Sequence, residues 1–249
     1  MCTVTIIPIV EEAEIVGLRV ANNRDELLRR AAALPPTQRR YGERTALLPI
    51  DPDSGGTWIA ANDAGLFLTL LNSHPEGHGG DESDSLLSRG VIIPTLLHCV
   101  SVVEAIDTVG KLDVTRYRPF RLVVLSHSEL AEFYSDGERL TLFPMRRLTG
   151  PRLFVSSGFG DEVIESRRRL FDEHFADADD STWVSRQEAF HRHSWPDRQH
   201  VSVCMRRDDA QTVSHTVVEL TSKRSELTYF SGVPDGTLAP VTASLDVSR

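Results

Sequence analysis

The sequence predicts an α+β fold in which two antiparallel sheets pack face to face and helices cover their outer surfaces. Three observations predict it. Strand-like runs come in groups that short turns join, which favours antiparallel pairing. Two stretches with helical periodicity separate these groups. The resulting order of strands, helices, strands, helices and strands packs naturally as two sheets with helices outside.

Composition and charge limit the functional classes that need to be considered. The chain has 249 residues, of which 40% are hydrophobic and 25% charged, as in soluble globular proteins. No repeat or linker interrupts it, so we predict a single domain over residues 1–249. The net charge of −9 argues against a nucleic-acid partner. Three widely spaced cysteines, no apolar run of about 18 residues and no signal-peptide pattern predict a cytoplasmic protein without membrane insertion.

The first 72 residues contain two predicted hairpins. Runs rich in Thr, Val and Ile at 2–10 and 14–21 flank a short acidic turn. The second hairpin pairs residues 54–63 with 65–72 through a turn of the sequence NDAG. A polar and Pro-rich stretch at 22–44 lies between the hairpins. It predicts that the strand beginning at residue 14 ends near residue 22.

Beyond residue 72 the pattern alternates between helices and strands. Residues 75–84 lack hydrophobic anchors and predict a mobile loop. Ser101 and Glu104 have the spacing of a capping box, which predicts a helix start. The predicted helices are 86–97, 102–112, 160–175 and one within 182–194, and the predicted strands are 120–126, 129–137, 139–145, 201–207, 212–220 and 226–232.

Cys2 is the first candidate for chemistry. The sequence lacks the GxxxxGK[ST], HExxH, CxxC and GxSxG motifs of common nucleotide, zinc and serine-hydrolase sites. Removal of Met1 would leave a thiol and an α-amine on one residue. An α-amine has a pKa of about 7.7 to 8.0, so it can accept the thiol proton near neutral pH. The alternative is that Cys2 simply begins an edge strand as a small apolar residue.

Three polar residues extend this candidate site. Arg24 would lower the thiol pKa or hold an oxyanion, and Asp25 would orient the α-amine. Asn72, at the end of an apolar strand, would donate to a developing oxyanion. Each also has an ordinary interpretation, since Asn and Asp are common in turns and at helix starts.

Taken together, these residues resemble a known family. The chain has MC at its start, NNRDE at 22–26, GGTW at 55–58 and NDAG leading to LLN at 62–72. This order resembles the NRDE family, also called the transport and Golgi organisation 2 family, which is grouped with the N-terminal nucleophile (Ntn) hydrolases. The same order of Cys, Arg, Asp and Asn is similar to choloylglycine hydrolases and penicillin V acylases, which cut amides.

The resemblance implies a four-layer αββα sandwich and a role for each matching residue. Cys2 would be the nucleophile, Asp25 the partner of its amine, Arg24 a support for the thiolate and Asn72 an oxyanion donor. The implied activity is an amidohydrolase or acyltransferase that acts on a carbon–nitrogen amide bond of a small-molecule amide or acyl ligand. It requires no cofactor. The oligomeric state stays open.

The second half of the chain departs from the family pattern. Arg121 stands where the family has Asn, Ser157 or Gly158 where a second Asn usually lies, and His200 where related members have Arg. A second hypothesis is therefore kept: a non-catalytic carrier with the same fold, which binds haem or acyl-CoA. Haem enters only under this alternative.

The remaining candidates have simpler interpretations. His74, His78, His191, His193 and His200 do not form the three- or four-ligand pattern of a zinc site, and no metal is predicted. The run of arginines at 167–169 points around the helix axis and is interpreted as a solvated face. The other two cysteines, at 99 and 204, lie in apolar segments and are interpreted as inert core thiols.

Overall fold

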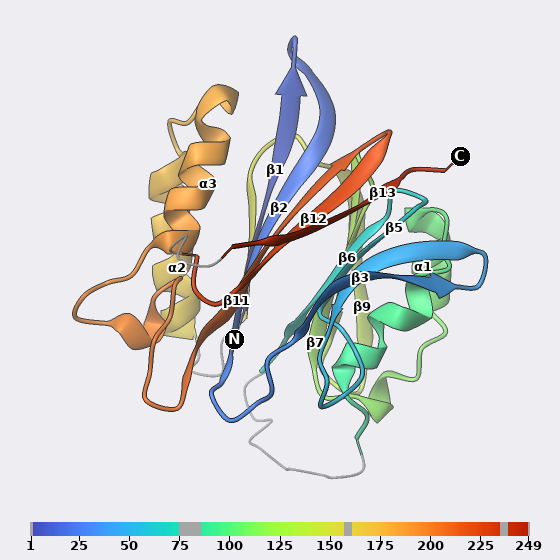
Figure 1. Ribbon diagram of the computed structural model, residues 1–249, viewed down its shortest axis with the longest axis horizontal. Coiled ribbons are helices and arrows are strands. Elements are labelled where there is room, and N and C mark those ends of the chain that lie inside the picture. The colour runs from blue at the N-terminus through green and yellow to red at the C-terminus, as the bar shows by residue number, and fades with distance from the viewer. Residues whose placement is uncertain (1, 75–85, 157–160, 235–238, 249) are drawn as a thin grey trace.

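The computed structural model describes residues 2–74, 86–156, 161–234 and 239–248. Two sheets form the centre of the molecule (Figure 1). The six-stranded sheet has the order β10-β1-β2-β11-β12-β13, and the seven-stranded sheet runs in sequence from β3 to β9. Their bounds are β1 Cys2–Glu11, β2 Glu14–Leu27, β3 Leu34–Tyr41, β4 Arg44–Ile50, β5 Ile59–Asn62, β6 Phe67–Asn72, β7 Phe120–Leu125, β8 Glu129–Ser135, β9 Leu140–Arg147, β10 Arg152–Ser156, β11 Ala210–Thr221, β12 Arg224–Ser231 and β13 Val241–Asp246.

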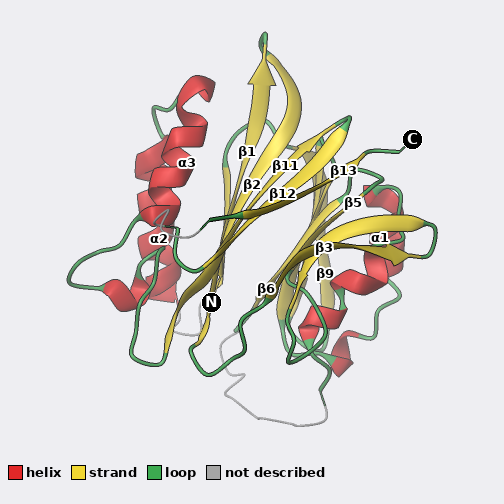
Figure 2. Ribbon diagram, in the orientation of Figure 1, coloured by secondary structure: helices red, strands yellow, loops and turns green. Residues whose placement is uncertain are grey.

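Helices cover the two outer faces (Figure 2). The helices α2 (Asp161–Phe175) and α3 (Trp183–Arg192) pack on the six-stranded sheet, against β10, β1 and β2. On the seven-stranded sheet lie α1 (Val102–Val109) and the short 3₁₀ helices η1 (Arg89–Val91) and η2 (Ile93–Leu96). Three further 3₁₀ turns are η3 Val114–Arg116, η4 Asp180–Thr182 and η5 Gln199–Val201. The predicted sandwich of two antiparallel sheets with helices outside is confirmed.

The layers are held together by apolar side chains that alternate along the strands. On β1, Val4 and Ile6 face the seven-stranded sheet, where they join a buried cluster that includes Ile59 and Phe67. The residues between them on β1 face α2 and α3 instead, because successive strand residues point to opposite faces. Burying a side chain of this size stabilises the fold by about 1.5–3 kcal/mol, so the inter-sheet cluster holds the site's two walls in place.

Both predicted N-terminal hairpins are confirmed, but the end of the second strand was predicted wrongly. The strand β2 continues through the polar residues Asn22–Asp25 to Leu27. These residues are almost completely buried, and Asn23 is fully inaccessible. Polar residues tolerate such a strand only when each finds a partner, and their partners come from distant parts of the chain.

Three further expectations differ from the structure. Residues 86–97 form two 3₁₀ helices in place of one α-helix, and Pro94 lies at the start of the second, where the missing N–H costs least. Residues 201–207 are irregular, because their carbonyls serve side chains of the neighbouring layers. The strands β3, β4, β10 and β13 were not predicted. Residues 75–84, the predicted loop, lie outside the described residues.

The predicted capping box is present at α1. The Ser101 hydroxyl accepts from the backbone N–H of Glu104 at 3.1 Å, and a Glu104 carboxylate oxygen accepts from the N–H of Val100 at 2.7 Å. Within the described part of the chain, no helix combines the length and the apolar character that crossing a membrane requires.

Candidate functional site

A pocket of about 110 Å³ opens where the two sheets diverge at the start of β1. Cys2, Arg24, Asp25 and Asn72, the four residues predicted from the sequence, all line it. They come from β1, β2 and β6, so the pocket has one wall on each sheet. The remaining lining residues are Glu26, Arg30, Asp51, Ser54, Thr57, Trp58, Leu70, Ser88, Arg89 and Gly90.

Cys2 is held by strands on both of its sides. It pairs with Arg24 on β2 and with Ser156 on β10. Its backbone nitrogen, which becomes the α-amine when Met1 is removed, donates to the Ser156 hydroxyl at 3.0 Å. Burial raises the pKa of the Cys2 thiol and the Asp25 carboxylate raises it further, whereas the Arg24 guanidinium lowers it. Ser156 was given no role from the sequence, although it directly precedes Ser157, a position compared with the family's second Asn.

The NNRDE segment places its side chains alternately on the two faces of β2. Asn22 and Arg24 face the seven-stranded sheet, where Asn22 accepts from the Trp58 indole N–H at 3.2 Å. Asn23 and Asp25 face α2 and α3. Strand geometry therefore directs the Arg24 side chain into the pocket and the Asp25 carboxylate toward the helices, so Asp25 borders the pocket from the other face of β2.

Arg24 is fixed by an acid and an aromatic ring. One guanidinium nitrogen donates to Asp51 Oδ2 at 2.9 Å, and the guanidinium carbon lies 4.4 Å from the centre of the Trp58 ring. Asp51 Oδ2 also accepts from Arg30 Nη2 at 2.6 Å. Arg24 is thereby held with its positive charge near Cys2, and Asp51, which the sequence did not single out, is what orients it.

Asp25 is bound to Arg167, and this pair corrects the expectation for the arginine run. Arg167 is completely buried, and its two terminal nitrogens each lie 3.4 Å from Asp25 Oδ2. Thr212, opposite Asp25 on β11, donates to Oδ1 at 2.7 Å. Burial raises the pKa of the Asp25 carboxyl, and the Arg167 charge and the Thr212 hydroxyl lower it.

The position of Arg167 could have been recognised from helix periodicity. It is three residues after Ile164 and three or four before Leu170 and Phe171, so it lies on the apolar face of α2. Its guanidinium also donates to the Thr3 hydroxyl at 2.6 Å and to the Val201 carbonyl at 3.1 Å. These bonds tie α2 to the floor of the site.

Asn23 organises a second buried network beneath the same strand. Its amide nitrogen donates to the carbonyls of His191 and Val203, at 2.9 and 3.0 Å. The amide oxygen therefore faces the two rings, and it accepts from Nδ1 of His191 at 3.0 Å and from Nδ1 of His215 at 2.7 Å. His191 Nε2 is left to accept from the Thr5 hydroxyl at 2.7 Å. His191 is consequently neutral, and its bonds join α3 to β1 and β2.

The other predicted positions differ in how they relate to the pocket. Asn72 lines it, and no hydrogen bond to its side-chain amide is found among the described residues, so the amide is available to a ligand. His200 is exposed on η5 and lines no part of the pocket. Arg121 pairs with Glu132 at 3.3 Å on the neighbouring strand. Ser157 and Gly158, and likewise His78, lie outside the described residues.

The GGTW segment positions one wall of the pocket through a close backbone contact. The N–H of Thr57 donates to the Gly90 carbonyl at 2.9 Å. A Cβ on Gly56 would lie 2.4 Å from the Gly90 carbonyl carbon, so only glycine fits there. This contact fixes η1, and with it Arg89, beside Cys2.

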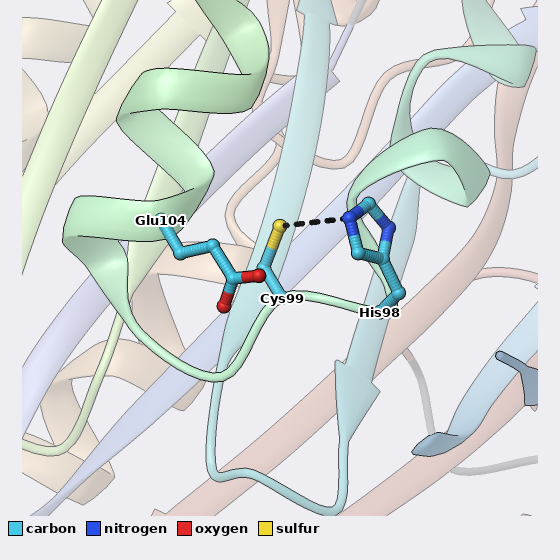
Figure 3. Close-up of side chains that lie close together, drawn as sticks. All are labelled: His98, Cys99 and Glu104. Carbon is cyan, nitrogen blue, oxygen red and sulfur yellow. Dashed lines mark hydrogen bonds between the residues drawn. The ribbon is translucent and has the colours of Figure 1, made fainter. Parts of the chain in front are cut away.

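A separate cluster of His98, Cys99 and Glu104 has the chemistry of metal ligands, with its ligand atoms within 4.8 Å of one another (Figure 3). The Cys99 sulfur lies 3.9 Å from His98 Nε2. One Glu104 oxygen, however, is already bonded to the start of α1. Cys99 is fully buried in the core, and burial raises the pKa of its thiol. The cluster lies apart from the pocket, and its Glu104 carboxylate caps the start of α1.

Solved structures that resemble this fold include the following two. One is an N-acylethanolamine-hydrolyzing acid amidase ortholog from Caenorhabditis elegans, with 11% identity, coverage of 86% of this chain and 91% of that chain, and a TM-score of 0.54. The other is a mutant of conjugated bile acid hydrolase from Clostridium perfringens, with 11% identity, coverage of 98% and 92%, and a TM-score of 0.51. At this identity the likeness shows the fold alone, that of the Ntn hydrolases.

The sequence itself gives the family. No curated protein matches the chain. A family model described as Transport and Golgi organisation 2 matches residues 1–147, which contain Cys2, the NNRDE segment and Asn72. Because this match spans more than half of the 249 residues, the chain belongs to the Transport and Golgi organisation 2 family.

Proposed function

We propose that the protein is an Ntn-type amidohydrolase or acyltransferase that attacks a carbon–nitrogen amide bond with Cys2. The observation that supports this most directly is the meeting of Cys2, Arg24, Asp25 and Asn72 in one pocket. Residues from three strands supply a nucleophile, a cation and an amide donor there, and the Asp25 carboxylate lies behind them on the helix face of β2. A group of this composition in a concave site is what acyl transfer requires.

The reaction begins when removal of Met1 turns the Cys2 backbone nitrogen into an amine. The amine accepts the thiol proton, and the sulfur forms a bond to the amide carbonyl carbon. The tetrahedral intermediate collapses as the carbon–nitrogen bond breaks, and the proton passes to the leaving amine. Water, or another acceptor, then attacks the thioester and returns the Cys2 thiol.

The other residues have supporting roles in this proposal. Ser156, 3.0 Å from the Cys2 nitrogen, orients the amine. Arg24 stabilises the thiolate, since its charge lowers the pKa of Cys2. The Asn72 amide donates to the oxyanion. Asp25 orients the α-amine, and Arg167 balances the Asp25 charge from the helical layer.

The alternative is a non-catalytic carrier that uses the same pocket to bind haem or acyl-CoA. One observation favours it: burial raises the pKa of the Cys2 thiol. A group that stays a neutral thiol at working pH is a poor nucleophile. The two hypotheses therefore differ in one point. The enzyme requires that the α-amine freed by removal of Met1 deprotonates the Cys2 thiol despite its raised pKa, and the carrier does not.

The experiment measures processing, thiol reactivity and turnover on one preparation. Intact mass is expected to show loss of Met1, because the amine base exists only then. A panel of small amides is then tested with the wild type, Cys2→Ala and the control Cys204→Ala. We expect turnover and a thioester mass adduct in the wild type and the control, and neither in Cys2→Ala.

Other outcomes decide for the carrier. A retained Met1 excludes the mechanism, because the nitrogen would be a non-basic amide. A Cys2 alkylation rate near neutral pH no faster than that of a model cysteine argues in the same direction. Haem titration followed by its absorption band tests the carrier directly, and saturable binding that persists in Cys2→Ala supports it.

A further inference from the structure

Arg89 differs from the other two arginines of the pocket in forming no ion pair among the described residues. Arg24 and Arg30 both donate to the Asp51 carboxylate, at 2.9 and 2.6 Å. Arg30 also donates to Glu26 at 3.2 Å. The only hydrogen bond found for Arg89 among the described residues goes to the neutral Pro119 carbonyl, at 2.9 Å, and it forms no ion pair with any carboxylate that the structure describes.

The surroundings of Arg89 make an unpaired charge costly. Arg89 is partly buried in the pocket wall, and burial together with the nearby Arg118 charge lowers the pKa of Arg89 to about 10. It therefore stays protonated at neutral pH. A charge removed from water without a partner destabilises a protein unless something else neutralises it. The chain has a net charge of −9, yet no described carboxylate pairs with this cation. An unpaired cation beside a thiol is typical of a site that binds an anionic ligand.

The backbone holds Arg89 where a ligand of Cys2 would reach it. Both residues line the same pocket, and a negative charge on Cys2 favours the charged form of Arg89. The η1 turn that carries Arg89 is fixed by the contact between Gly56 and Gly90 and by the Ser88 hydroxyl, which accepts from the N–H of Gly90 at 3.3 Å. A preorganised guanidinium with free N–H groups matches a carboxylate.

We propose that Arg89 is the anion-binding residue of the pocket and that the ligand attacked by Cys2 carries a carboxylate. This rests on the proposed function in taking Cys2 as the attacking group, but binding of the carboxylate requires no turnover. The substrate class is then an amide with a free carboxylate, on the amine half, as in an N-acyl amino acid, or on the acyl half, as in the monoamide of a dicarboxylic acid.

Two small reagents of similar size test the anion site without turnover. Iodoacetate and iodoacetamide both alkylate a thiolate: a sulfur–carbon bond forms, the carbon–iodine bond breaks and iodide leaves. They differ in carrying a carboxylate or a neutral amide. The rates at Cys2 are measured by peptide mass, and the ratio of the iodoacetate rate to the iodoacetamide rate is calculated. Because both reagents need the thiolate, this ratio does not depend on the thiol pKa. It is then divided by the same ratio for a free cysteine peptide.

The expected ratio is about tenfold in favour of iodoacetate, the effect of one charge-assisted contact. Arg89→Gln should reduce it to the value of the free peptide, because an altered thiol pKa changes both rates equally and cancels in the ratio. Arg118→Gln is the matched control, since Arg118 is exposed and acts on Arg89 only through its charge. An unaltered ratio in Arg89→Gln, or an equal loss in Arg118→Gln, overturns the proposal.

A second measurement uses only the wild type and so does not depend on the folding of a variant. N-acetylglycine or succinamic acid should protect Cys2 from iodoacetamide, and neutral N-acetylglycinamide should not. Protection by the first places the carboxylate on the amine half, and protection by the second places it on the acyl half. If neither compound protects Cys2, the proposed anion site is wrong. If the protein nevertheless hydrolyses amides, the proposed amidohydrolase function stands without a carboxylate-binding Arg89.

Discussion

Arg167 on α2 and Asp25 on β2 form an ion pair in which both side chains are excluded from water, with Nη2 of the arginine 3.4 Å from Oδ2 of the aspartate. The pair joins the helical layer to the strand that carries the NNRDE segment. Arg167, which does not line the pocket, neutralises Asp25 from the helical layer.

Arg167→Met should destabilise the protein by about 3–5 kcal/mol, because Asp25 would remain buried without its partner. Chemical unfolding measures this, and Arg168→Met is the control, since Arg168 is the exposed neighbour on the same helix. Adding Asp25→Asn to Arg167→Met should restore part of the loss, as expected for two coupled residues. A cost for Arg167→Met no larger than that for Arg168→Met would contradict the role of the pair.

Acid should weaken the fold through the two histidines that share Asn23. Burial, with the Arg19 charge, lowers the pKa of His215 to about 3, and burial, with the neighbouring His215, lowers that of His191 well below 6.5. Because the folded-state values are depressed, the stability they contribute is complete above 6.5 and falls as the unfolded chain takes up protons below it. At about pH 5 each histidine should cost about 2 kcal/mol.

Urea unfolding at several pH values measures that slope. His215→Gln should make the free energy of unfolding less dependent on pH between about 6.5 and 5. Replacement of the exposed His200 by Gln should leave the slope unchanged. Equal slopes in the wild type and His215→Gln would show that the buried pair does not control acid stability.

Gly56→Ala should destabilise the protein by about 1–3 kcal/mol, because its new methyl group would overlap the backbone of Gly90. The change should also displace η1 and reduce any preference of Cys2 for iodoacetate. Gly150→Ala is the control, since a Cβ there meets nothing within 4 Å. Thermal unfolding of the two variants compares them, and equal melting temperatures would count against the close contact.

The parts of the fold that were predictable depend on short-range patterns. The hairpins follow from runs of β-branched residues and from turn residues such as those of the NDAG segment, where Asn62 Oδ1 accepts from the N–H groups of Ala64 and Leu66. The helix at 102 follows from its capping box. The four site residues followed from their order and from the family resemblance, and their catalytic roles stay predictions.

The parts that were missed depend on contacts between distant residues. Polar residues at the end of β2 are typical of a turn, and they form a strand only because Asp51, Trp58, Arg167 and Thr212 supply partners. No local pattern contains that information. The unpaired state of Arg89 is likewise a property of the assembled pocket.

The alternation of the NNRDE segment between two layers also bears on how the chain folds. Its residues near position 24 bind groups from the region of 51–58 and from residues 167–215, so sequence separations of up to about 190 residues must be closed before the motif is satisfied. Contacts of such high sequence separation form slowly. Residues 1–147, the part that the family model matches, do not include β11 and α2, so several partners of the motif lie outside that part.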